Sequence, residues 1–280
     1  MRWWYDAVIQ TLMPTLLLLA SNPLAVSALL IALYMVWVFG LSLYLKSNGI
    51  VDIAYGLAYI LISATVEWNF GLHPLGAIAT TLISIWGLRL AIRIHERTRG
   101  KSEDFRYAAW RGEWRWFKTR SFFQIYMLQG VIILLISIPP LVAASYEAPF
   151  LAPVSIVGIV VWIVGFLFEA IGDYQLDSFI RDPAHKGELM QSGLWSITRH
   201  PNYFGEALMW WGIWLLALPA IAPFGILAVI GALLASPVLI TYMLLKVSGV
   251  PMLEASLSKR PDWPQYASRV PVFIPWFSKR

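Results

Sequence analysis

The feature that most constrains this chain is its succession of apolar stretches, each close to 20 residues long and separated by short breaks. A helix of about 20 apolar residues crosses the roughly 30 Å hydrocarbon core of a bilayer. Of the 280 residues, 59% are hydrophobic and only 13% are charged. The sequence therefore excludes a soluble domain and predicts an all-α, polytopic transmembrane helix bundle, with residues 1–280 forming a single membrane domain.

Proline marks several of the breaks, because its ring removes a backbone donor and restricts the residue before it. Such pairs occur at Asn22-Pro23, His73-Pro74, Ala148-Pro149 and Ala222-Pro223. The pattern predicts eight spans, with seven as the alternative, and residues 4–20 are interpreted as a retained helix because Ser21-Asn22-Pro23 is a poor cleavage site. The predicted helices are 4–20, 24–45, 50–68, 74–95, 122–144, 152–176, 202–218 and 223–246.

Basic residues are confined to alternate connections. The breaks near 21–23, 69–73, 145–150 and 219–222 contain no Lys or Arg, whereas 97–120 is rich in both. Because cytoplasmic loops carry the excess of Lys and Arg, both termini are predicted to be cytoplasmic. Most basic residues are expected to set this topology and to contact anionic headgroups, so nucleic acid is not an expected partner.

Some charged residues lie inside apolar helices, where they are costly unless they pair or line a wet cavity. Arg89 and Arg93 are one turn apart in such a helix. The acids in such positions are Asp52, at the start of one helix, and Glu169, Asp173 and Asp177, along one stripe of another. Two interpretations of these charges stay open: pairing between helices, and a ligand pocket.

The densest polar motif is GLWSITRHPNYFGE at residues 193–206. Pro201 is suited to the first position of a helix, and Arg199 and His200 precede it. A helix N-terminus attracts anions, so these two residues suit a phosphate or carboxylate. Asn202 and Glu206 then share a helix face that can hold a cofactor amide or hydroxyl. A capped helix in an aromatic belt is the alternative.

Segment 97–120 interleaves charges with aromatic residues, which is typical of an interfacial amphipathic helix. The alternative is a lid over a cofactor, with Arg106 and Tyr107 as contacts. The chain has no cysteine, which excludes thiolate chemistry. Its four histidines are dispersed, so no metal site is expected.

The motif at 193–206 resembles the C-terminal part of the membrane steroid 5α-reductases, and sterol reductases and isoprenylcysteine methyltransferases are similar there. The chain resembles more closely a bacterial family of uncharacterised membrane proteins allied to the steroid 5α-reductases. This similarity covers nearly the whole chain. It also rests on VDIAYG at 51–56, WGLRL at 86–90 and GKSEDFRY at 100–107.

The resemblance implies a seven-helix core in a bacterial inner membrane, with a cofactor cavity that opens to the cytoplasm and a lipophilic substrate that enters from the membrane. Residues 4–20 would be an extra helix, 24–120 the substrate-side helices and cytosolic loop, and 121–280 the cofactor-binding part. The resemblance also implies a catalytic acid at Asp52. It puts Trp86 where the reductases have a tyrosine, and Tyr55 is a candidate substitute because an indole is not a general acid.

NADPH is the cofactor that the resemblance implies, held by Asn202, Glu206 and Asp173, and Arg89 matches an arginine of the reductases. Without a Gly-x-Gly-x-x-Gly after a strand, binding would be non-Rossmann. The residues expected to bind the cofactor are Arg89, Arg106, Tyr107, Glu169, Asp173, Arg181, Arg199, His200, Asn202, Tyr203, Glu206 and Lys246.

The expected function is reduction of an enone C=C bond in a steroid-like (3-oxo-Δ4) or isoprenoid lipid. Two alternatives stay open: an S-adenosylmethionine-dependent methyltransferase of a lipid or prenylated substrate, and a non-enzymatic lipid-binding membrane protein. A lipophilic small molecule and membrane lipid are the expected partners.

Overall fold

The computed structural model describes residues 21–101, 103–149 and 152–277, and every regular element within these ranges is helical. The all-α prediction is therefore confirmed. Seven helical segments in the described ranges are long and apolar enough to cross a membrane, so this is an integral membrane protein. The predicted helix 4–20 lies outside the described residues, and the side of the membrane that each terminus faces stays a prediction.

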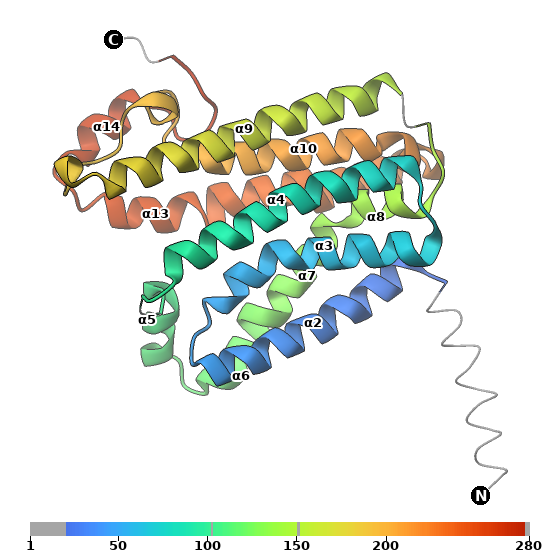
Figure 1. Cartoon of the computed structure of the whole chain (residues 1–280), viewed down its shortest axis with the longest axis horizontal. Coiled ribbons are helices and arrows are strands. Elements are labelled where there is room, and N and C mark those ends of the chain that lie inside the picture. Colours follow the sequence, from blue (N-terminus) through green and yellow to red (C-terminus); the bar gives the residue numbers. More distant parts are fainter. Residues whose placement is uncertain (1–20, 102, 150–151, 278–280) are drawn as a thin grey trace, which may run out of the picture. The chain divides into compact units, whose positions relative to one another are not determined.

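The chain divides into two compact units, residues 1–150 and 151–280 (Figure 1). The sequence grouped residues 121–280 together, whereas the helices between 117 and 145 belong to the first unit. The first unit contains α2 (Pro23–Leu45), α3 (Ile50–Phe70), α4 (Pro74–Thr98), α5 (Phe105–Glu113), α6 (Phe117–Ser121), η1 (Phe122–Met127), α7 (Leu128–Ile136) and α8 (Ile138–Ser145).

Helix starts in the first unit follow the sequence closely. Pro23 and Pro74 each occupy the first turn of a helix, where the missing donor has no cost. The Asn22 side chain caps α2 by accepting hydrogen bonds from the backbone N–H groups of Leu24 at 3.0 Å and Ala25 at 3.1 Å. These two prolines mark the helix boundaries that the sequence predicted.

The predicted helix 122–144 is interrupted at Ser137, where α7 ends and α8 begins. Pro139 and Pro140 follow the break, and neither offers an N–H to the preceding turn. At the break, the buried Ile133 carbonyl accepts from the Ser137 hydroxyl at 2.8 Å and from the Ser137 backbone N–H at 2.9 Å. Two adjacent prolines therefore divide segment 122–144, which its apolar pattern alone predicts to be one helix.

The second unit is built on α9 and α10, which run side by side along most of their lengths (Figure 1). Its last span, Ile226–Leu257, contains π-helical turns, one of them at Pro237, whose missing N–H cannot continue the α-helical pattern. The elements are α9 (Pro153–Arg181), η2 (Pro183–His185), η3 (Gly193–Ser196), α10 (Pro201–Ile221), η4 (Ala222–Phe224), α11 (Ile226–Leu233), η5 (Leu234–Val238), α12 (Leu239–Tyr242), η6 (Met243–Val247), α13 (Val250–Leu257) and α14 (Trp263–Arg269).

Candidate functional site

In the first unit, the carboxylate of Asp52 lies in the first turn of α3 and is held by two side chains from α5. The Tyr107 hydroxyl donates to Asp52 Oδ1 at 2.8 Å, and Arg106 Nη2 donates to Oδ2 at 3.1 Å. Tyr107 is buried, and about a quarter of the Asp52 and Arg106 side chains is exposed. Asp52 therefore meets a phenol from a segment more than 50 residues away.

Asp104 positions Arg106 for this contact. Its side chain caps α5 by accepting from the Arg106 backbone N–H at 3.0 Å, and it also accepts from Arg106 Nε at 2.9 Å. Although burial acts to raise it, these hydrogen bonds hold the pKa of Asp104 below its ordinary value. The guanidinium of Arg106 thus bridges two carboxylates, Asp104 and Asp52.

Glu103 ties the same segment to the start of α3. Its carboxylate accepts from the Asn48 backbone N–H at 2.7 Å and forms a two-point ion pair with Arg111, at 2.9 and 3.0 Å. These contacts place α5 against the loop that precedes α3. In this structure, Arg106 and Tyr107 both donate hydrogen bonds to Asp52. The segment that carries them is therefore attached to the helices of the first unit.

Burial, followed by the neighbouring Asp52 carboxylate, raises the pKa of Tyr107 well above its ordinary value. Tyr107 therefore stays a neutral phenol over the physiological range and acts as a hydrogen-bond donor. The sequence predicted that Tyr107 contacts the cofactor and that Tyr55 is the phenol near Asp52. No spacing in the sequence indicates that residue 107 meets residue 52.

Tyr55 and Trp86, the two other residues expected at the catalytic centre, meet in an aromatic cluster with Tyr59. Trp86 packs edge-on against both phenol rings, with centroids 6.2 Å from Tyr55 and 5.8 Å from Tyr59. The Tyr59 hydroxyl donates to that of Tyr55 at 3.1 Å. The cluster is possible because α3 and α4 touch at Gly56 and Gly87, where a β-carbon on either residue would lie 2.6 Å from the other's carbonyl oxygen. Arg89 follows Trp86 by three residues and is half-buried.

In the second unit, glycines bring α9 and α10 into close backbone contact. Gly165 and Gly172 of α9 lie two turns apart, as do Gly205 and Gly212 of α10. A β-carbon on Gly205 would lie 2.5 Å from the Glu169 backbone nitrogen. Small residues allow such approach in membrane helix pairs, where van der Waals contact drives association.

Three carboxylates gather along this glycine contact. Glu169 and Asp173 of α9 are buried, each 3% exposed, and Glu206 of α10 follows Gly205 directly. Glu206 lies within electrostatic range of both other acids. The acid stripe predicted from i, i+4 spacing therefore faces protein at Glu169 and Asp173, while Asp177 is half-buried one turn further on.

Asn202 lies one turn before Glu206 on α10. Its side-chain Oδ1 is buried and accepts no hydrogen bond from the residues that the structure describes. A buried acceptor without a donor is costly, and it fits a ligand that offers an N–H group. The carboxamide N–H₂ of a nicotinamide is such a group. NADPH could therefore supply the donor that Asn202 Oδ1 needs.

Arg199 and His200 bind an anion, and that anion is the chain's own Glu254. Arg199 Nε donates to Glu254 Oε1 at 2.8 Å, and His200 Nε2 lies 2.9 Å from the same oxygen. Arg199 Nη1 also donates to the carbonyls of Ala267 at 2.8 Å and Val270 at 2.9 Å. Arg199 thus fastens the C-terminal segment to the start of α10, and its role toward a cofactor phosphate stays a prediction.

His200 is fully buried, and its Nδ1 has no hydrogen-bond partner among the described residues. Burial lowers the pKa of His200 despite the opposing effect of Glu254, so the ring is neutral near pH 7. Its ring stacks on Tyr203, with centroids 5.4 Å apart. The sequence suggested Glu254 as a cofactor contact in the C-terminal tail, and it did not indicate that Glu254 pairs with Arg199 and His200.

Two further predicted cofactor contacts are exposed cations. Arg181 lies in the last turn of α9, and Lys246 lies in η6. Both side chains are exposed. Within the described ranges, no cluster of three His, Asp or Glu side chains is arranged to hold a metal ion.

Residues 37–270 match the family described as "Protein of unknown function (DUF1295)". The chain belongs to the DUF1295 family. No curated protein and no solved structure matches this DUF1295 chain. The family match includes both groups described above, the Asp52 contacts in the first unit and the carboxylate cluster in the second.

Proposed function

We propose that this chain is a membrane-embedded, NADPH-dependent reductase of an enone C=C bond in a steroid-like (3-oxo-Δ4) or isoprenoid lipid. The observation that carries the proposal is the hydrogen bond from Tyr107 to Asp52. Reduction of an enone needs a neutral donor that stabilises the oxygen as it gains negative charge. A buried phenol with a raised pKa, oriented by a carboxylate, has this property.

In the proposed reaction, the chemistry that NADPH would supply when bound is transfer of a hydride to the β-carbon of the enone. Tyr107 has one O–H, so it turns from Asp52 to the substrate oxygen when that oxygen enters. Arg106 stays on Asp52 and keeps the carboxylate satisfied during this exchange. A proton from water then completes the α-carbon, and the products are the saturated ketone and the oxidised nucleotide.

Cofactor binding is assigned to the second unit. Asn202 Oδ1, which has no partner among the described residues, and the carboxyl group of Glu206 are both acceptors, and both suit the N–H₂ of the nicotinamide carboxamide. The resemblance to the steroid 5α-reductases supports the same two residues. The localisation proposed is a bacterial inner membrane with this site on the cytoplasmic side.

The first experiment is a thermal-shift titration of the detergent-purified protein with NADPH, NADH and S-adenosylmethionine, because a ligand that binds only the folded state raises its stability. The proposal expects stabilisation by NADPH. Stabilisation by S-adenosylmethionine alone would instead favour a lipid methyltransferase, and no response to any of the three would favour a non-enzymatic lipid-binding role.

The second experiment measures NADPH oxidation by the reconstituted protein with a 3-oxo-Δ4 steroid. The matched control substrate is the 3-oxo steroid without the double bond, which offers the same oxygen and no acceptor carbon. Asp52→Asn is expected to slow reduction and to leave the NADPH-induced thermal shift unchanged. Equal loss of both signals would remove Asp52 from the proposed chemistry.

A further inference from the structure

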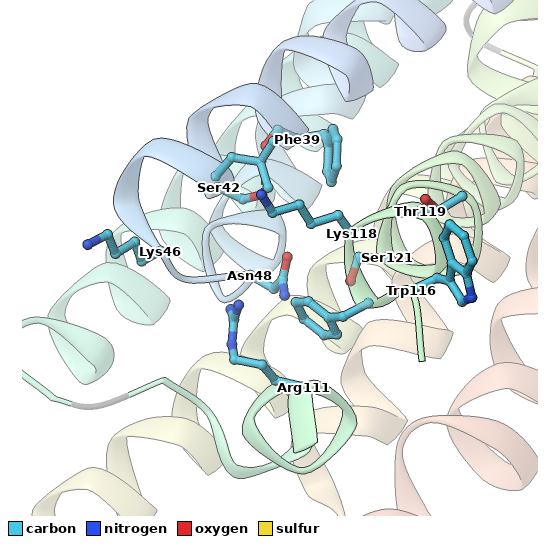
Figure 2. Close-up of a pocket in the computed structure, with 11 residues that line it drawn as sticks. Phe39, Ser42, Lys46, Asn48, Arg111, Trp116, Lys118, Thr119 and Ser121 are labelled. Atoms are coloured by element: carbon cyan, nitrogen blue, oxygen red, sulfur yellow. The ribbon is translucent and has the colours of Figure 1, made fainter. Parts of the chain in front are cut away.

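A cavity of about 610 Å³ lies in the first unit, between the end of α2 and the beginning of α6 and η1 (Figure 2). Its wall includes residues from the loop after α2 and from α5. None of the residues proposed for the reduction lines it. The cavity therefore needs an explanation of its own.

Two buried polar groups in its wall lack hydrogen-bond partners within the described part of the chain. Asn48 is 3% exposed and Ser121 is 1% exposed, and Asn48 Nδ2 and Ser121 Oγ have no partner. The Tyr126 hydroxyl donates to Asn48 Oδ1 at 2.9 Å, which fixes Nδ2 as the free end of the amide. The wall thus offers buried donors that call for an acceptor.

Three cationic residues line the cavity, namely Lys46, Arg111 and Lys118, and Figure 2 shows Arg111 pointing toward Asn48 while Lys46 extends away from it. Arg111 is held in place by its ion pair with Glu103 and by the Phe117 ring, whose centroid lies 4.4 Å from the guanidinium carbon. No carboxylate is among the residues that line the cavity. Its charge and its free donors therefore both select an anion with several acceptor oxygens.

The apolar surroundings place this anion at a membrane surface. Leu43 lines the cavity and is 44% exposed, and Phe39 lies one turn before it on the same membrane-spanning helix. Trp116, at the other wall, is also exposed, as is typical of aromatic residues at headgroup level. Lys46 is the C-cap of α2 and is exposed, as is typical of lysines at the membrane interface.

We propose that this cavity binds the phosphate of an anionic phospholipid headgroup, with Asn48 Nδ2 and Ser121 Oγ as donors and Lys46 and Lys118 as counter-charges, because the charge of Arg111 is already balanced by Glu103. The acyl chains would extend from Leu43 and Phe39 along the exposed apolar surface of α2. The inference is independent of the proposed reductase activity, because it uses none of the same residues.

The test is native mass spectrometry of the detergent-purified full chain titrated with phosphatidylglycerol or phosphatidylcholine. Phosphatidylglycerol is expected to bind more tightly. Replacing both Lys46 and Lys118 with Ala should weaken that binding about thirty-fold, the size expected for two lysines near an anionic headgroup. The matched control replaces Lys186 and Lys259, which are exposed and lie in the second unit, and should leave the affinity unchanged.

Ser121→Ala provides a second variant that leaves the charge of the protein unchanged. It removes the Oγ for which the described residues offer no partner, so lipid binding should fall while the thermal stability in detergent stays close to that of the parent. Equal binding of the two lipids, or equal losses in the Lys46/Lys118 and Lys186/Lys259 variants, would overturn the proposal. Equally tight binding of glycerol 3-phosphate would overturn the lipid source and identify a soluble phosphate ester as the ligand.

Discussion

The hydroxyl of Tyr107 and the carboxylate of Asp52 are joined by a 2.8 Å hydrogen bond between α5 and the first turn of α3. The phenol comes from the charged, aromatic-rich segment after α4, and the carboxylate comes from a membrane-spanning helix. A change in the position of α5 therefore changes the environment of Asp52. This coupling gives the amphipathic segment a part in the proposed chemistry.

Replacing Tyr107 with Phe removes only the hydroxyl. We expect enone reduction to slow by about 10²–10³-fold, the usual loss when one donor to a developing oxyanion is removed. The NADPH-induced thermal shift should persist. Tyr34→Phe is the matched control, because it also deletes a partly buried hydroxyl on a hydrogen-bonded tyrosine. Equal rates for the Tyr107 and Tyr34 variants would exclude Tyr107 as the donor.

Asn202→Ala and Glu206→Gln test the proposed cofactor face. Each should weaken NADPH binding by about ten-fold, since a lost hydrogen bond in a buried site costs about 1–3 kcal/mol. The measurement is the NADPH concentration that gives half of the maximal thermal shift. Asn69→Ala, at an exposed end of α3, is the control. Unchanged affinity in both cofactor variants would move the nucleotide elsewhere.

Gly205→Ala tests the helix contact that holds the carboxylates. The new β-carbon would meet backbone atoms of Glu169 and Gly165 at 2.5 Å, and backbone cannot yield as a flexible side chain can. We expect a loss of about 1–3 kcal/mol or more, seen as a lower midpoint of thermal unfolding in detergent. Gly231→Ala, where no described residue outside the glycine's own stretch of helix lies within 4 Å of the added carbon, should change the midpoint little. Similar midpoints for the two variants would show that the contact is not close.

The buried His200 predicts a pH dependence of stability. Because burial lowers its pKa in the folded protein, the unfolded chain binds the proton more readily. Stability should therefore fall as the pH drops below about 6.5, the ordinary histidine value, and level off below the lowered pKa. His200→Gln keeps a donor for Glu254 without titrating, so it should flatten this part of the profile. Thermal unfolding between pH 7.5 and 5 measures both proteins.

The membrane-spanning helices could be predicted from the sequence because the length of an apolar stretch and the position of a proline determine helix bounds without distant contacts. Pro23 and Pro74 begin helices as predicted, and the acids at 169 and 173 face protein as their spacing indicated. The break at Ser137 was missed because two prolines override an otherwise continuous apolar run.

The candidate site was harder to predict, because its contacts join residues far apart in the chain. Nothing local pairs Tyr107 with Asp52, or Glu254 with Arg199. The charge pattern alone showed that an anion should meet Arg199 and His200. It did not show that the protein supplies that anion itself.

The glycine contact of α9 and α10 also restricts how this chain can change its length. One inserted residue turns the rest of a helix by about 100°. Inserted between Gly165 and Gly172, it would carry Asp173 away from α10 and place a β-carbon at the position of Gly172, 3.0 Å from the Pro201 side chain. Insertions and deletions should therefore be tolerated in the polar connection at 182–192 and excluded from this stretch of α9.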